Sequence, residues 1–219
     1  MRIRYLNRKR WFIAVLCAAL CLGLTGCRNN ELENHAFPLA LGVEMKQRDD
    51  ALQVYMAYPN LQDQQSKENA LSSDCYWEQT AASIYEAVEE MSENSSQNVD
   101  LNHLKVLILD KAMLDAPKQM EGVIAFFEEK NDVAWNTYVI LMEKDMKQLF
   151  SDEADLSGSL GIYLEDMLEG WADLKTRSLT TMGDFMSQYY NETGTLYLPV
   201  IEMKEKKPVL KNFVRVEKI

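Results

Sequence analysis

The sequence predicts an α/β chain of the mixed α+β kind, in which a mixed β-sheet with flanking helices forms a single main domain. Residues 104–109 are a short, almost continuously apolar run, typical of a strand that is buried on both faces. Apolar residues recur at helical spacing over residues 81–94 and 159–174. The chain has 219 residues, of which 47% are hydrophobic, so it can bury one core of ordinary size.

The first elements of the expected domain are two strands and a helix. Residues 36–46 and 52–59 predict strands that are joined by a charged turn. Residues 60–74 are polar and lack periodicity, which predicts a loop. Helix 81–94 follows, with Thr80 as its expected N-cap.

The middle of the chain predicts a crossover unit. Strand 104–109 is followed by a helix that Asp115 and Pro117 open, and residues 137–142 supply the next strand. A strand, a helix and a strand within about 40 residues predict two parallel strands.

The last elements are two helices and two strands. Helix 159–174 carries an apolar stripe on one side and acidic residues on the other. Thr181 and Asp184, three residues apart, resemble a capping box that starts a further helix. Strands are expected at 195–203 and 208–216, around the charged turn 204–207.

The first 27 residues have the pattern of a lipoprotein signal peptide. Five basic residues and no acid precede the apolar run 11–24, which is shorter than a membrane-spanning helix requires. The run ends in Leu24-Thr25-Gly26-Cys27, the lipobox pattern of bacterial lipoproteins, in which the cysteine receives a diacylglyceryl group before cleavage. We therefore expect lipidation at Cys27, and a mature domain that its acyl chains hold on the outer face of the cytoplasmic membrane.

The charge of the mature chain limits its partners. Cleavage before Cys27 removes five of the 23 basic residues and none of the 34 acidic ones, which leaves a net charge of −16. This charge argues against nucleic acid as a partner and against electrostatic adsorption to anionic lipid.

No pattern of residues indicates a catalytic or metal site, so no cofactor is expected. The two histidines, His35 and His103, have no second metal ligand at a suitable spacing, and Cys75 is expected to be a buried small side chain. Four acidic residues of helix 159–174 could pair as acid and base, but a solvated face explains them better. Five aromatic residues could line a ligand cleft, although such residues are more often core. The acids are Glu165, Asp166, Glu169 and Asp173, and the aromatic residues are Trp135, Tyr138, Trp171, Tyr189 and Tyr190.

The order of several short motifs resembles the amino-terminal part of the Ger(x)C family, the lipoprotein C subunit of spore germinant receptors. After the lipobox cysteine come five segments in the expected order, of which LALGV and HLKVLIL are the best markers. The segments are Glu31-Leu32, Ala36 to Val43, Ser83 to Ala87, His103 to Leu109 and Leu198 to Ile201. The resemblance divides the chain into a signal peptide at 1–27, an amino-terminal domain at 28–203, and a strand at 204–219 that could begin a second domain.

The resemblance implies a non-enzymatic subunit that is anchored at the inner membrane of the spore. Its implied partners are the membrane-spanning A and B receptor subunits, which respond with it to small nutrients. It supplies no catalytic residues, so Cys27 is the one functional position carried over. The alternative that stays open is a lipoprotein that captures a small nutrient for a transporter, and a lipoprotein hydrolase is a third.

Overall fold

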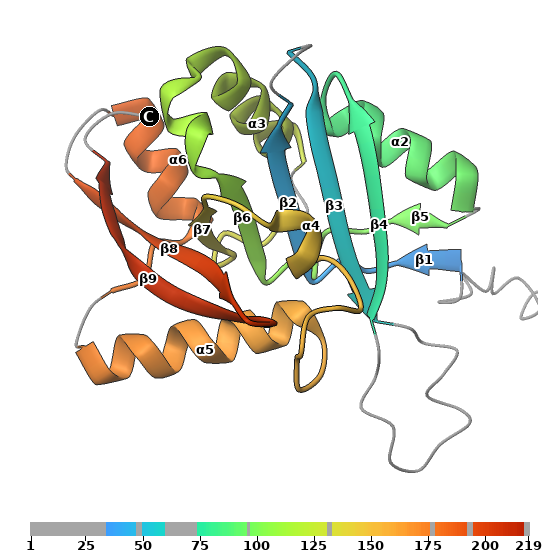
Figure 1. Ribbon diagram of the computed structural model, residues 1–219. Helices are drawn as coiled ribbons and strands as arrows, with labels where there is room; N and C mark the ends of the chain where they lie inside the picture. Colours follow the sequence, from blue (N-terminus) through green and yellow to red (C-terminus); the bar gives the residue numbers. More distant parts are fainter. Residues whose placement is uncertain are drawn as a thin grey trace, which may run out of the picture. The chain divides into compact units, whose positions relative to one another are not determined.

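Seven strands form one mixed sheet in the computed structural model of the chain (Figure 1). The structure describes residues 34–46, 50–59, 74–95, 97–130, 133–175, 178–191 and 195–216. The order across the sheet is β4-β3-β2-β6-β7-β8-β9, and a separate pair of short parallel strands is formed by β1 and β5. The strands are β1 His35–Ala36, β2 Ala40–Met45, β3 Leu52–Pro59, β4 Asp74–Ala81, β5 Asn98–Val99, β6 Val106–Asp110, β7 Tyr138–Met142, β8 Leu196–Lys204 and β9 Lys207–Val216.

The four central strands β2, β6, β7 and β8 are parallel, and the antiparallel strands lie at the two sides of the sheet. The predicted crossover is confirmed, because β6 and β7 pair in parallel and the helix between them covers one face. The first two predicted strands are also confirmed, since β2 and β3 pair antiparallel over six residue pairs. Residues 47–49 of the predicted turn lie outside the described residues. β9 pairs with β8 along its length, with an irregularity in register between Val200 and Ile201.

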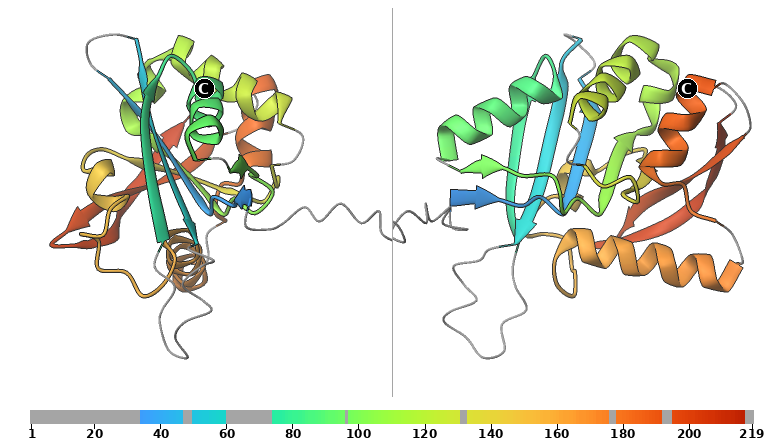
Figure 2. Two further views of the ribbon diagram at one scale, coloured as in Figure 1. Left: turned by 90° about the vertical axis from the view of Figure 1, so that its right-hand side faces the viewer. Right: turned by 180° about the vertical axis from the view of Figure 1, so that it is seen from behind.

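Helices cover both faces of this sheet (Figure 2). Helices α2, α3 and α6 pack on the face that carries Leu107 and Leu109, whereas α4 and α5 pack on the face that carries Val106 and Ile108. The strand period of two explains why alternate residues of β6 enter different core clusters. The helices are α2 Ile84–Ser95, α3 Pro117–Glu129, α4 Met146–Leu149, α5 Leu160–Lys175 and α6 Met182–Asn191, and a 3₁₀ segment, η4, spans Lys111–Asp115.

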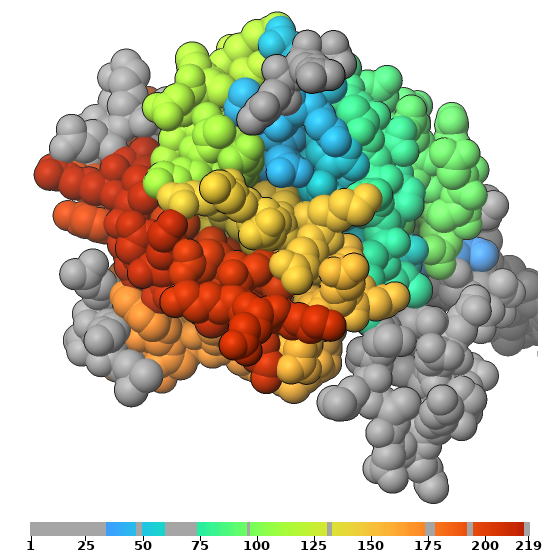
Figure 3. Space-filling view, in the orientation of Figure 1, coloured from blue at the N-terminus to red at the C-terminus, as the bar shows by residue number. Residues whose placement is uncertain are grey.

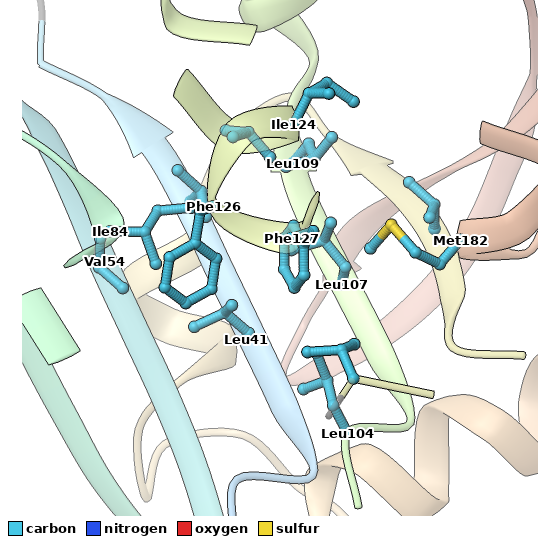
Figure 4. Close-up of a cluster of buried hydrophobic side chains, with 14 of the residues drawn as sticks. Leu41, Val54, Ile84, Leu104, Leu107, Leu109, Ile124, Phe126, Phe127 and Met182 are labelled. Atoms are coloured by element: carbon cyan, nitrogen blue, oxygen red, sulfur yellow. The ribbon is translucent and has the colours of Figure 1, made fainter. Parts of the chain in front are cut away.

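The larger core cluster lies between the sheet and the α2–α3–α6 layer (Figure 4). Phe126 and Phe127 of α3 reach toward the sheet, with Phe126 close to Leu41 of β2. Both side chains are buried, as the predicted apolar stripe of this helix requires. The mixed α+β fold expected from the sequence is thus confirmed.

Several local expectations need correction. Thr80 belongs to β4 and is not the N-cap of α2; Ser83 is, because its hydroxyl accepts from the backbone N–H of Glu86 at 3.2 Å. Apolar spacing alone did not separate the end of the strand from the start of the helix. Helix α3 begins at Pro117 as predicted, but Asp115 belongs to η4 and does not open it. The residue directly before Pro117 is Ala116, which makes no side-chain cap. The loop predicted at 60–74 lies outside the described residues except for Asp74, which begins the unexpected strand β4.

The start of α5 is fixed by two contacts with segments far away in the sequence. Asp74 of β4 accepts from the backbone N–H of Leu160 at 2.7 Å and from the hydroxyl of Ser159 at 3.2 Å. Gly161, the second residue of α5, lies against Leu39: an added Cβ would be 2.5 Å from the carbonyl carbon of Leu39. The close approach of helix and backbone therefore requires glycine at position 161.

The two glycines of α5 give a matched pair of tests. We expect Gly161→Ala to lower the free energy of unfolding by about 1–3 kcal/mol, since its methyl group would overlap the backbone of Leu39. Gly170→Ala meets no atom within 4 Å and should raise stability by about 0.5–1 kcal/mol through helix propensity. Urea denaturation monitored by circular dichroism measures both. Equal effects of the two substitutions would contradict the contact at Gly161.

Candidate functional site

The predicted lipidation residue, Cys27, lies outside the described residues. The described domain begins seven residues later at Asn34. The one functional residue that the sequence predicts therefore precedes the first described residue.

The two histidines lie around one phenylalanine ring. The ring centroids of His35 and Phe37 are 5.8 Å apart in a stacked arrangement, and Phe37 meets His103 edge-on at 5.6 Å. Within the described part of the chain, no group of three or more histidine, cysteine or acidic side chains could hold a metal ion. Both histidines therefore contact the ring of Phe37 near β1. They do not form part of a metal-binding group within the described residues.

The acidic residues of α5 are engaged separately. Glu165 forms an ion pair with Lys105 at 3.1 Å, and Glu169 accepts a hydrogen bond from the hydroxyl of Tyr138 at 3.1 Å. Burial, followed by this hydrogen bond, raises the pKa of Tyr138. Asp166 and Asp173 are exposed. These acids act mainly as the polar side of an amphipathic helix.

The aromatic residues that could have lined a cleft are divided among different places. Tyr138 borders a shallow polar hollow beside Glu169, and Trp171 stacks on Phe213 of β9 with ring centroids 4.4 Å apart. Of the five aromatic residues, Trp135 and Tyr190 are the two that line the same cavity, which lies between α3 and α6. Tyr189 packs against the larger core cluster.

A larger groove opens at the carboxyl ends of the parallel strands, where open α/β sheets commonly bind ligands. Its volume is about 590 Å³, and we call it the charged groove because acidic and basic side chains dominate its lining. Figure 3 shows the face of the molecule on which β9 and the segments after β6 and β7 meet around this groove. The lining residues are Asp110, Lys111, Ala112, Leu114, Asp115, Glu143, Lys144, Val214, Arg215 and Val216.

Asp110 organises one wall of the charged groove. One oxygen of its carboxylate accepts from the backbone N–H of Ala112 at 3.0 Å and so caps η4. Its other oxygen accepts from the backbone N–H of Met45 at 3.3 Å, at the end of β2. The side chain thus joins the ends of two neighbouring parallel strands to the segment that follows.

Glu143 links the groove to the hairpin of β8 and β9. Its carboxylate oxygens lie 2.6 Å from the ammonium of Lys111 and 2.7 Å from that of Lys211. Hydrogen bonds from these two lysines lower the pKa of Glu143 from its ordinary value near 4.5 to about 2. The arrangement joins the ends of β6 and β7 to the middle of β9 through charge. It leaves carboxylates and cations side by side for recognition of a polar ligand.

Sequence reasoning missed these residues, although part of the signal was present. Lys111 and Glu143 each come just after an apolar parallel strand, and such residues meet at one edge of a sheet. Lys211 lies on β9, and only the folding of that hairpin against β7 brings it to Glu143.

One family of proteins matches most of the chain. The model of the spore germination protein N-terminal domain matches residues 28–203. The chain belongs to this family. The match confirms the resemblance to Ger(x)C proteins that the ordered sequence motifs indicated, and it gives this spore germination protein a role in germination. Comparisons with curated proteins and with solved structures found no significant match.

The helices of the germination protein add one observation on membranes. Within the described ranges, none of them is both long enough and apolar enough to cross a bilayer.

The low pKa of Glu143 makes a prediction about acid stability. A carboxyl whose pKa is lower in the folded state stabilises the fold above its unfolded pKa, and this contribution is lost as the pH falls from about 4.5 to about 2. Glu143→Gln should therefore have a lower denaturation midpoint than the parent protein at pH 7. Near pH 2 the two midpoints should converge.

Thermal denaturation at a series of pH values measures this convergence. Glu153→Gln is a matched control, because Glu153 is an exposed carboxylate after α4. A difference between the Glu143→Gln variant and the parent that stayed constant from pH 7 to pH 2 would contradict the role of the two lysines.

Proposed function

We propose that this protein is the lipid-anchored subunit of a nutrient germinant receptor in the inner membrane of the spore. Its lipid is attached at Cys27, and its domain docks onto the membrane-spanning receptor subunits without catalysing a reaction. The observation that carries this proposal is the position of the family match, which begins at residue 28, directly after the lipobox cysteine.

The charge of the domain supports anchoring by lipid. A net charge of −16 for residues 27–219 disfavours adsorption to anionic lipids, so the attachment must come from another source. Each buried acyl methylene contributes about 0.8 kcal/mol, and stable anchoring needs more than one chain. A diacylglyceryl group on Cys27 meets this requirement.

The length of chain after Cys27 supports docking close to the membrane. Seven residue steps separate Cys27 from Asn34, the first described residue of the domain. An extended chain spans at most about 3.6 Å per residue, so the domain would start within about 25 Å of its lipid. At this distance, it lies beside the extracytoplasmic parts of integral membrane proteins.

Replacement of the lipidated cysteine tests the proposal. We expect Cys27→Ala to abolish incorporation of labelled fatty acid and to reduce the membrane-bound fraction by at least about tenfold, because the acyl chains are lost. Germination by nutrients should be impaired, whereas germination by agents that bypass the receptors should proceed normally.

Cys75→Ala is the matched control for this experiment. Cys75 is a partly buried cysteine of β4, and its replacement should leave labelling and germination unchanged. Normal fatty-acid labelling of the Cys27→Ala protein would refute the anchor. Normal nutrient germination of spores that carry an unlabelled Cys27→Ala protein would refute the need for anchoring in receptor function.

A further inference from the structure

A small apolar cavity opens on the surface between α3 and α6, on the face opposite to α5. Its volume is about 130 Å³, and we call it the α3–α6 pocket. Four buried side chains form its floor, two aromatic residues flank it and two charged residues stand at its rim. They are Phe127, Val133, Met182 and Met186 in the floor, Trp135 and Tyr190 as flanking residues, and Glu128 and Lys130 at the rim.

The floor of this pocket belongs to the core of the domain. Figure 4 shows Phe127 of α3 and Met182 of α6 pointing toward each other over the sheet. Both are less than a tenth exposed, so the floor is held in place by the packing of two helices on the sheet. A site built on such elements is kept in shape before any ligand binds.

The flanking residues are unusually exposed for their size. Trp135 is 67% exposed and Tyr190 is 53% exposed, whereas the methionines between them are 4% exposed. Tryptophan, tyrosine and methionine are enriched at protein interfaces, and tryptophan and tyrosine dominate the energetic centres of such interfaces. Covering these rings would remove a large apolar area from water.

Local contacts fix the backbone of Trp135 and the hydroxyl of Tyr190. The carbonyl of Trp135 accepts from the backbone N–H of Gly183 at 3.0 Å, and a Cβ at that glycine would lie 3.5 Å from the indole ring. The hydroxyl of Tyr190 is hydrogen-bonded to Glu128, which raises the pKa of the tyrosine. Ordered side chains lose less entropy on binding, and this favours affinity.

The size of the cavity limits what it can take up. A cavity of roughly 150 Å³ lined by apolar side chains binds benzene. The α3–α6 pocket, at about 130 Å³, is therefore suited to one phenyl ring or one branched aliphatic side chain.

The surrounding surface selects the charge of the partner. Helices α2, α3 and α6 form one layer and together carry eight acidic residues and a single lysine, and Lys130 at the rim of the pocket follows α3 as a second basic residue. A basic partner would be attracted to this layer and an acidic one repelled. The acids are Glu86, Glu89, Glu90, Glu93, Glu121, Glu128, Glu129 and Asp184, and the lysine is Lys118.

We propose that the α3–α6 pocket is a docking site for a basic segment of a partner protein, which inserts one large apolar side chain between Trp135 and Tyr190. The identification of that partner as a receptor subunit rests on the proposed function. The pocket binds the apolar side chain, and the acidic layer selects basic neighbours on both sides of it.

Model peptides test this docking site on the full chain in phosphatidylcholine nanodiscs. The probe is a synthetic pentapeptide with one phenylalanine between two pairs of lysines. The methyl signals of ¹³C-labelled methionines report binding, and those of Met182 and Met186 should shift saturably. Peptides with alanine in place of phenylalanine, or glutamate in place of lysine, should bind at least about tenfold more weakly. Added salt should weaken the lysine peptide.

Alanine replacements of two exposed apolar residues, one at the pocket and one away from it, test the site further. Trp135→Ala should weaken peptide binding at least about tenfold, because it removes one side of the pocket. Ile162→Ala replaces a residue of α5 that is 46% exposed on the other side of the sheet, and binding should be unchanged. Unshifted Met182 and Met186 signals, equal binding of the glutamate peptide, or undiminished binding to the Trp135→Ala protein would each overturn the proposal.

Failure of this proposal is distinguishable from failure of the proposed function. Peptide binding is measured in nanodiscs regardless of any acyl group, whereas acylation of Cys27 is measured by mass spectrometry of the same protein. Loss of peptide binding with intact acylation refutes the docking site alone. Absent acylation with intact peptide binding refutes the lipid anchor alone.

Discussion

The burial of the central parallel strands on both faces is the constraint on which this domain depends. Val106 to Leu109 of β6 are completely buried, and so are Val139 to Leu141 of β7. A strand with no solvated face requires a helical layer on either side, because its apolar side chains alternate in direction. The layer of α2, α3 and α6 and the layer of α4 and α5 both follow from this requirement.

The two layers meet the constraint differently. On one face, long apolar side chains such as Phe126 fill the space between the helices and the sheet. On the other, α5 approaches Leu39 so closely that Gly161 is needed, and Asp74 caps its first turn from a distant strand. The outer side of the first layer carries two exposed aromatic rings, Tyr190 at the end of α6 and Trp135 in the loop between α3 and β7.

Charge is distributed unevenly over the domain. The strand β9 and the turn before it are rich in lysine, and Lys211 reaches back to Glu143 at the end of β7. The charged residues of α2, α3 and α6 are all acidic except Lys118. The hairpin is therefore joined to the sheet by internal ion pairs, while the acidic layer keeps an uncompensated charge that suits a basic partner. Such a division of charge suits the docking and the lipid attachment that we propose.

The sequence by itself determined the elements whose signals are local. Apolar periodicity located β6, β7 and α5, a capping box located the start of α6, and ordered motifs identified the family. Asp184 and Thr181 do bond to each other at 2.7 Å, as their spacing of three predicted. The boundary of α2 and the strand β4 were not predicted, because their polar and aromatic residues carry no clear period. Only the tertiary structure decided which distant residues come together: Glu143 pairs with Lys211, Asp74 bonds to Leu160, and Trp135 and Tyr190 flank one cavity. These contacts depend on how the helices and the hairpin pack on the sheet, and long-range packing leaves no spacing in the sequence from which it could be read.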